Sequence, residues 1–85
     1  MIDRAVTIAY RAIRMAVAQS GLPERQHTPV ALYLLVVVCG VPGAAAATAA
    51  GCTKQNVSKS VRGVEERRED ASFDLALTRL EEIGR

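Results

Sequence analysis

Apolar residues recur at helical spacing along most of the chain, and Gly, Pro and small polar residues separate them into five predicted helices. The first helix is predicted from Asp3, its expected N-cap, to about Ser20, with Gly21 as the C-terminal stop and Pro23 just beyond. Its apolar stripe consists of Ile2, Val6, Tyr10, Ile13 and Val17. This stripe is expected to pack on the rest of the protein.

A second apolar patch lies on the nearly opposite face of the same helix, where Ile8, Ala12 and Met15 stand beside Arg4 and Arg11. A domain this small has difficulty burying both faces of one helix. The pattern therefore predicts a surface for a dimer or a protein partner. Two alternatives remain: scattered exposed apolar residues, which are normal, or cover by the C-terminal helix.

The second helix is predicted from Pro29 to about Cys39, with Thr28 as N-cap and Pro at the first helical position. It is apolar on almost every side, which in a soluble protein indicates a central helix. Its run Val36-Val37-Val38 would also suit a strand, but the chain offers no partner strand.

No charged residue occurs from Thr28 to Thr53, a length that could cross the ~30 Å apolar layer of a bilayer. Gly40-Val41-Pro42-Gly43 interrupts this stretch, and the alanines that follow are only weakly apolar. Two short buried helices therefore explain the stretch better than a membrane span.

A third helix is expected from Pro42 or Gly43 to Ala50, followed by a turn at Gly51 and Cys52. Thr53 is expected to cap a fourth helix that extends toward Asp70. The buried stripe of the fourth helix is Val57, Val61 and Val64. Ser72 is the expected N-cap of a fifth helix that ends at Gly84. The predicted fold is one domain over residues 1–85, an all-α compact five-helix bundle containing a helix-turn-helix.

Composition narrows the possible chemistry. Two cysteines and a single histidine, His27, indicate neither a metal site nor a disulfide framework, and reduced cysteines are typical of the cytoplasm. The beginning of the chain does not have the pattern of a secretory signal, so a cytoplasmic protein is expected. No acid–base or nucleophile constellation is present, so we expect neither an enzyme nor a cofactor.

The net charge of +2 is mild but unevenly distributed. Residues 54–62 hold three basic residues and no acid, whereas residues 65–70 hold four acids and two arginines. With the valines turned inward, Gln55, Ser58, Lys59 and Arg62 point outward, and Lys54 lies at the N-terminal end. A solvated helix face is the alternative explanation of this pattern.

These are residue types that bind the DNA major groove. Lys54, Gln55 and Asn56 are the predicted base contacts, because the N-terminal residues of a recognition helix reach the bases. Ser58, Lys59 and Arg62 are expected to position the duplex, and the amides near Thr53 to bind a phosphate. Arg25, in a connection with Gln26 and His27, would contact a phosphate or the minor groove, or would simply be solvated.

The segment from about residue 25 to 80 resembles the C-terminal DNA-binding domain of the chromosomal replication initiator DnaA, a Trp-repressor-like helix-turn-helix. Ala31-Leu32-Tyr33-Leu34 matches the family's Ala-x-Tyr-Leu element. Residues 50–57, Ala-Gly-Cys-Thr-Lys-Gln-Asn-Val, align with its Gly-Gly-Arg-Asp-His-Ser/Thr-Thr-Val signature, and Arg62-Gly63-Val64 with its Arg-x-Ile pattern.

The departures fall on the family's base-reading positions, which are occupied here by Cys52, Thr53, Lys54 and Gln55. The resemblance therefore implies the same fold with a different DNA sequence. No phosphate-binding Gly-x-x-x-x-Gly-Lys-Ser/Thr loop is present, so the chain is not itself an initiator ATPase. Free-standing relatives of this domain act as bacterial or phage transcription regulators, including activators of gene-transfer-agent clusters.

The leading hypothesis is a sequence-specific double-stranded DNA-binding transcription regulator, with a second copy or the transcription machinery as a possible protein partner. The alternative is a helical interaction module that docks on a transcription or replication partner and whose basic face is incidental. A small membrane protein is the third and weakest hypothesis.

Overall fold

The computed structural model describes residues 2–83, and within them the side chains of residues 4–82; this part of the chain is all-α and contains no strand. The helices are α1 (Ile2–Ala18), α2 (Glu24–Tyr33) with a π-helical continuation η1 (Leu34–Val38), α3 (Gly43–Ala50), α4 (Lys54–Arg67) and α5 (Ala71–Ile83). They form a compact bundle with extents of 37 × 24 × 21 Å. The expected five-helix all-α fold is confirmed.

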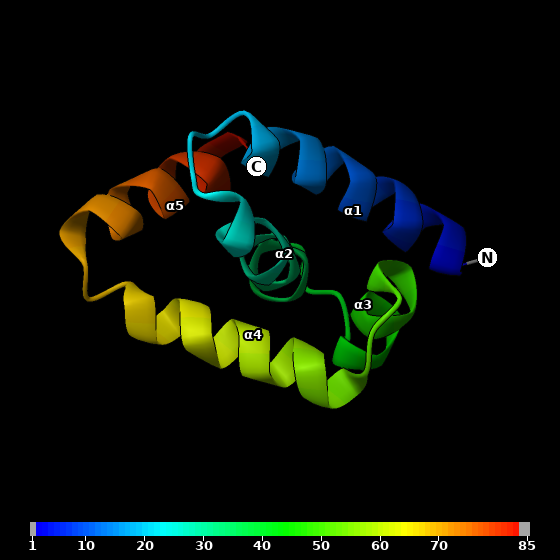
Figure 1. Ribbon diagram of the computed structural model, residues 1–85. Helices are drawn as coiled ribbons and strands as arrows, with labels where there is room; N and C mark the ends of the chain where they lie inside the picture. The colour runs from blue at the N-terminus through cyan, green and yellow to red at the C-terminus, as the bar shows by residue number, and fades with distance from the viewer. Residues whose placement is uncertain (1, 84–85) are drawn as a thin grey trace.

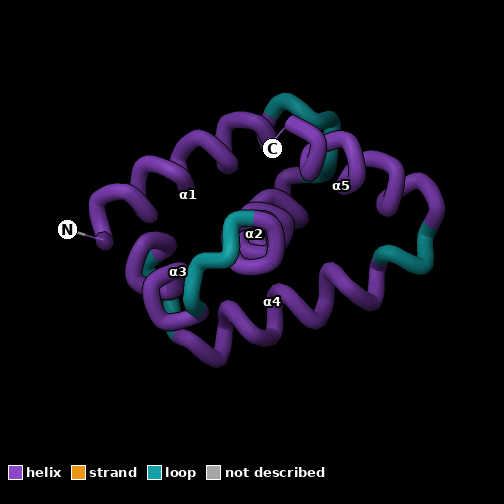
Figure 2. The backbone as a smooth tube through the Cα atoms, turned by 180° about the vertical axis from the view of Figure 1, so that it is seen from behind, coloured by secondary structure: helices purple, strands orange, loops and turns teal. Residues whose placement is uncertain are grey.

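Helix α2 and its continuation occupy the centre of the bundle (Figure 1). Helices α1 and α5 lie on one side of it and α4 on the opposite side, as the view from behind also shows (Figure 2). Helix α3 packs against the N-terminal parts of both α1 and α4. The outer faces of α1 and α4 therefore point in opposite directions, separated by the central helix.

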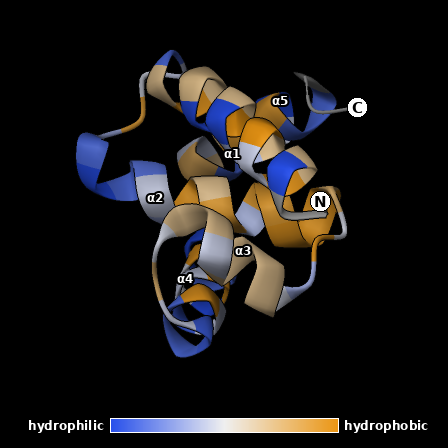
Figure 3. Ribbon diagram, turned by 90° about the vertical axis from the view of Figure 1, so that its right-hand side faces the viewer, coloured by the Kyte–Doolittle hydropathy of each residue, from blue (hydrophilic) through white to orange (hydrophobic). Residues whose placement is uncertain are grey.

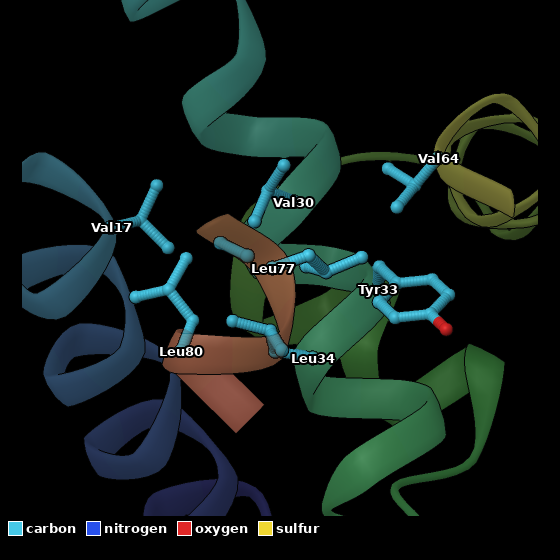
Figure 4. Close-up of a cluster of buried hydrophobic side chains, with 8 residues drawn as sticks. Val17, Val30, Tyr33, Leu34, Val64, Leu77 and Leu80 are labelled. Carbon is cyan, nitrogen blue, oxygen red and sulfur yellow. The ribbon is translucent and has the colours of Figure 1, made fainter. Parts of the chain in front are cut away.

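The core has two parts, one near each end of α4. The first joins α1, α2, α4 and α5 (Figure 4). Its buried members are Val17, Val30, Ala31, Tyr33, Leu34, Val64, Leu77 and Leu80. The second joins α1, the central helix, α3 and α4. Its buried members are Val6, Leu32, Leu35, Ala46, Ala47 and Val57. Helices α1 and α4 thus contribute buried residues to both halves of the core, and so connect the two halves.

The predicted apolar stripe of α1 is buried as expected: Val6 and Val17 are enclosed and Tyr10 and Ile13 pack against the core. The predicted helix bounds need small corrections. The helix begins at Ile2, so Asp3 lies inside its first turn and not at the N-cap, and it ends at Ala18. The side chains of Ile2 and Asp3 lie outside the described set.

The predicted start of the second helix at Pro29 is wrong. The helix begins five residues earlier, at Glu24, with Pro23 at the N-cap position and Pro29 in the interior. Glu24 in the first turn suits the helix dipole, and the buried Gln26 accepts a hydrogen bond from Arg67 of α4. This contact joins the first turn of α2 to the end of α4, and the helix continues through Pro29, which supplies no backbone donor.

The apolar run at the end of the central helix is a π-helical turn, a feature that the sequence analysis does not predict. Cys39 donates its backbone N–H to the carbonyl of Leu34 at 3.1 Å, five residues back. Val41 donates to Leu35 at 3.1 Å. The wider turn carries Val36 and Val38 to partly buried positions and leaves Val37 about half exposed. The helical interpretation of this run over a strand is confirmed.

The cap of the last helix is Asp70, which corrects the prediction of Ser72. The Asp70 carboxylate accepts hydrogen bonds from the backbone N–H groups of Ser72 and Phe73, at 2.9 and 3.2 Å. The Asp70 carbonyl accepts the first intrahelical bond, from Asp74. Asp is as good an N-cap as Ser, and the cap lies two residues earlier than predicted. Helix α4 ends at Arg67, before the predicted end toward Asp70. The predicted end of this helix, at Gly84, lies outside the described residues.

None of the helices described between residues 2 and 83 has the length and hydropathy that crossing a bilayer would require. The uncharged stretch from Thr28 to Thr53 instead supplies the buried apolar residues of the central helix and α3.

Candidate functional site

The turn between α3 and α4 has the predicted construction. Gly51 ends α3 in the left-handed conformation, with φ 72°, and the N–H of Cys52 is bonded to the carbonyl of Ala47 at 3.0 Å. Thr53 then adopts extended backbone, and its hydroxyl accepts a hydrogen bond from the N–H of Asn56 at 3.1 Å. The Thr53 cap is confirmed, and α4 begins at Lys54 directly after a turn of three residues.

Gly51, before this cap, and Gly63, after it, allow a matched test of the turn. We expect Gly51→Ala to destabilise the protein by about 1–2 kcal/mol, because φ 72° is unfavourable for a residue with a Cβ. We expect Gly63→Ala to stabilise it by about 0.5–1 kcal/mol, because Gly63 is helical. Neither new Cβ meets an atom within 4 Å, so packing does not intervene. Urea unfolding of the two variants measures both changes; a stabilising Gly51→Ala would contradict the turn geometry.

The buried stripe of α4 is also as predicted. Val57 and Val64 are enclosed, and Val61 is partly buried against both halves of the core. Because these valines fix the rotation of the helix, the opposite face is turned outward. Figure 3 shows this outward side of α4 as strongly hydrophilic, next to the weakly hydrophobic α3.

Five of the predicted DNA contacts lie together on that outward face. They line one shallow depression on the surface of α4, and all five are exposed: Lys54, Gln55, Ser58, Lys59 and Arg62. The stem of Lys54 also passes over Gly43 of α3, where a Cβ on Gly43 would lie 3.8 Å from the Lys54 Cγ. The start of α3 therefore supports the side chain at the N-terminal end of this face.

The charge of the outward face changes sign along the helix. Its first nine residues, 54–62, include only basic and neutral side chains. Glu65 and Glu66 are exposed near the end of the helix, and Glu69 is exposed just beyond it. The face is therefore attractive to an anion near the turn and repulsive to one near its C-terminal end. The unpaired backbone N–H groups of the first turn of α4 add to the attraction at the same end.

Of the other three predicted contacts, Thr53 caps α4 as described above, and two are placed differently. Asn56 is exposed, but its position on the helix lies away from the face shared by Lys54 and Arg62. Arg25 is not in a loop, as the sequence analysis has it, but in the first turn of α2. It shares a surface depression with Glu66 and Arg67, at the far end of α4 from Lys54. The structure thus separates Arg25 from the cluster on α4.

Two arginines at the end of α4 have structural roles that the sequence analysis does not assign. Arg67 donates to Gln26, as described above. Arg68 joins three elements: it donates to Asp74 at 2.5 Å and to the Tyr33 hydroxyl at 2.9 Å, and pairs with Glu81 at 3.0 Å. The hydrogen bond to Asp74 is the largest cause of a raised Arg68 pKa; burial opposes it, and Tyr33 and Glu81 add to it. The sequence of residues 65–70, with four acids and two arginines, does not indicate which of the two arginines turns toward the protein.

The remaining titratable candidates have simple surroundings. His27 contacts the carbonyl of Leu22 through Nε2 at 2.8 Å, a bond that ties the start of α2 to the preceding turn. Cys39 and Cys52 are free thiols. Among the described residues no group of His, Cys, Asp and Glu is arranged to hold a metal ion.

A comparison of the chain with protein-family models, curated proteins and solved structures found no match.

Proposed function

We propose that this protein is a sequence-specific double-stranded DNA-binding regulator of transcription, with α3, the turn and α4 as its helix-turn-helix. The observation that carries the proposal is the outward face of α4, where Lys54, Gln55, Ser58, Lys59 and Arg62 are exposed together and no acid intervenes. Lysine, arginine and glutamine are the side chains that bind base edges and phosphates in the major groove. A resemblance to the DnaA C-terminal domain is consistent with this assignment.

In this proposal Lys54 and Gln55 contact bases, because the duplex meets the N-terminal end of α4 first. Asn56 is exposed in the same turn but away from the outward face, and it would reach a base edge or a backbone oxygen. Lys59 and Arg62 neutralise phosphates and Ser58 donates to the backbone, while the amides after Thr53 hold a further phosphate. The protein acts by occupying a site or by recruiting a partner, with no chemical step and no cofactor. We also propose that the protein acts in the cytoplasm and that its target is a bacterial or phage gene cluster.

Selection of duplexes from a random DNA pool tests this function directly. We expect the purified protein to enrich a defined motif. We expect the Lys54→Ala, Gln55→Ala double variant to lose that motif, because both side chains lie at the base-reading end of α4. Arg79→Ala, which removes an exposed arginine from α5, is the matched control and is expected to enrich the unchanged motif.

The alternative is a docking module with an incidental basic face, which the exposed side chains of Ile8 and Met15 favour. No enrichment from the pool, or enrichment that the double variant retains, would support that alternative. Salt dependence separates the two as well, because phosphate neutralisation releases counterions and so weakens DNA binding steeply with added salt.

A further inference from the structure

A groove on the side of the protein away from α4 has an almost entirely apolar lining. It has a volume of about 260 Å³ and lies between α1, the π-helical turn and α5. Its lining residues are Ala9, Ala12, Ile13, Ala16, Leu34, Val38, Cys39 and Leu80. Of these, Leu34 and Leu80 also belong to the core, where they lie next to one another (Figure 4).

The wall of this groove on α1 is built from small side chains at helical spacing. Ala9, Ala12 and Ala16 follow one another at i, i+3 and i+7, so they share one side of the helix. Because alanine side chains are short, they leave room for larger apolar side chains from outside and let a second helix approach closely. The groove therefore has the shape and polarity of a surface that accepts one face of an amphipathic helix.

The groove continues into an exposed apolar ridge. Ile8 is 62% exposed and Met15 is 66% exposed, and both lie on the outer side of α1 next to Ala12. Cover of these residues by α5, one alternative left open by the sequence, is not present. Ala12 belongs both to the ridge and to the groove wall, so the two form one continuous apolar surface. Continuous apolar surfaces of this kind mark sites of protein interaction more often than isolated exposed residues do.

The far edge of the ridge is basic. Arg4 and Arg11 are exposed, and their i, i+7 spacing places both on the same side of α1. This side is adjacent to that of Ile8 and Met15. Every charged side chain described on α1 is an arginine. In a second copy docking through the same face, the described charged side chains of α1 would again be arginines, and their repulsion opposes association. A partner with carboxylates along one side of its helix would instead pair with the two arginines.

We propose that this groove and ridge bind an amphipathic helix of a partner protein, whose apolar side chains enter the groove and whose acidic edge contacts Arg4 and Arg11. The inference does not depend on DNA binding, because the surface lies on the opposite side of the central helix from α4 (Figures 1 and 2). Both surfaces can therefore be occupied together.

The test uses two synthetic helical peptides with identical leucine positions, one with glutamates and one with lysines along the same edge. Fluorescence anisotropy with the full chain measures their affinities. We expect the acidic peptide to bind at least about tenfold more tightly than the basic one. Equal affinities, or no binding of either peptide, would overturn the proposal.

Variants locate the binding surface. Ile8→Ser with Met15→Ser is expected to lower the affinity for the acidic peptide about tenfold or more. The control is Leu75→Ser, at an α5 residue that is 55% exposed and outside the groove, and it is expected to leave this affinity unchanged. Arg4→Glu with Arg11→Glu is expected to reverse the preference to the basic peptide. Unchanged thermal melting establishes that each variant is folded.

Light scattering, which measures the oligomeric state, tests whether a second copy of the chain occupies the groove instead. We expect the wild-type chain to remain a monomer at the concentrations of the peptide experiment. If it is instead a dimer that Ile8→Ser with Met15→Ser converts to a monomer, the groove is occupied by a second copy and the proposal is wrong.

Discussion

Reversing the charge of Lys59 and Arg62 to glutamate is expected to lower DNA affinity by about 100-fold or more, equivalent to about 2.7 kcal/mol. Both side chains are exposed on the outward face of α4, within its acid-free part, residues 54–62. Two phosphate contacts would be replaced by two repulsive carboxylates beside Glu65 and Glu66. The affinity is measured by fluorescence anisotropy on a selected duplex at two salt concentrations. We expect the slope of log affinity against log salt to become shallower by about 2 in the variant.

The matched control for this variant is Arg4→Glu with Arg11→Glu on α1. Each pair of substitutions removes two positive charges and adds two negative ones, so the net charge of +2 becomes −2 in both cases. Any loss that comes from overall charge alone appears equally in the two variants. We expect the α1 variant to keep its affinity within about threefold, because its arginines lie on the opposite side of the bundle (Figure 1). Equal losses in both would show that the face of α4 has no special role.

Leu32→Ala is expected to destabilise the protein by about 2–5 kcal/mol. Leu32 lies on the central helix, has no exposed surface and packs in the half of the core that supports α3 and the start of α4. At about 0.05–0.15 kcal/mol per residue, the whole stability of an 85-residue chain is about 4–13 kcal/mol. The loss is therefore a large share of the total. Urea unfolding followed by circular dichroism measures it.

Leu75→Ala provides the same chemical change at an exposed position. Leu75 is 55% exposed on α5, so its truncation removes little buried surface and is expected to change the free energy of unfolding by no more than about 0.5 kcal/mol. Comparable losses at Leu32 and Leu75 would contradict the assignment of the central helix to the core.

Local chemistry predicted the region of the turn almost residue by residue. Gly51 ends α3, the Thr53 hydroxyl caps α4, and Val57 and Val64 face inward, all as expected. Each of these features depends on residues close in sequence: a backbone angle that favours glycine, a hydroxyl three residues before its donor, and a spacing that repeats with the helix. The cluster on the outward face of α4 follows from the same spacing.

Long-range contacts decided the features that were missed. Thr28 and Pro29 form a good local start signal, yet Gln26 is buried against Arg67, forty-one residues away, and the helix begins at Glu24. That earlier start is also the reason why Arg25 lies at the far end of α4. The inward turn of Arg68 likewise depends on Tyr33 and Glu81, which no local pattern connects to it.

The change of charge along α4 also bears on how much sequence one copy of the protein can read. The acid-free part of α4 runs from Lys54 to Arg62, eight steps of about 1.5 Å, or about 12 Å along the helix axis. At about 3.4 Å per base pair, such a length faces at most about four base pairs before the glutamates are reached, and the residues assigned to phosphates reduce the number that is read. A word of four base pairs occurs by chance about once in 256 positions, far too often to mark a single promoter. In the proposed function, discrimination between one promoter and the rest of the DNA would therefore come from short sites repeated in tandem, or from a bound partner that contacts further DNA sequence.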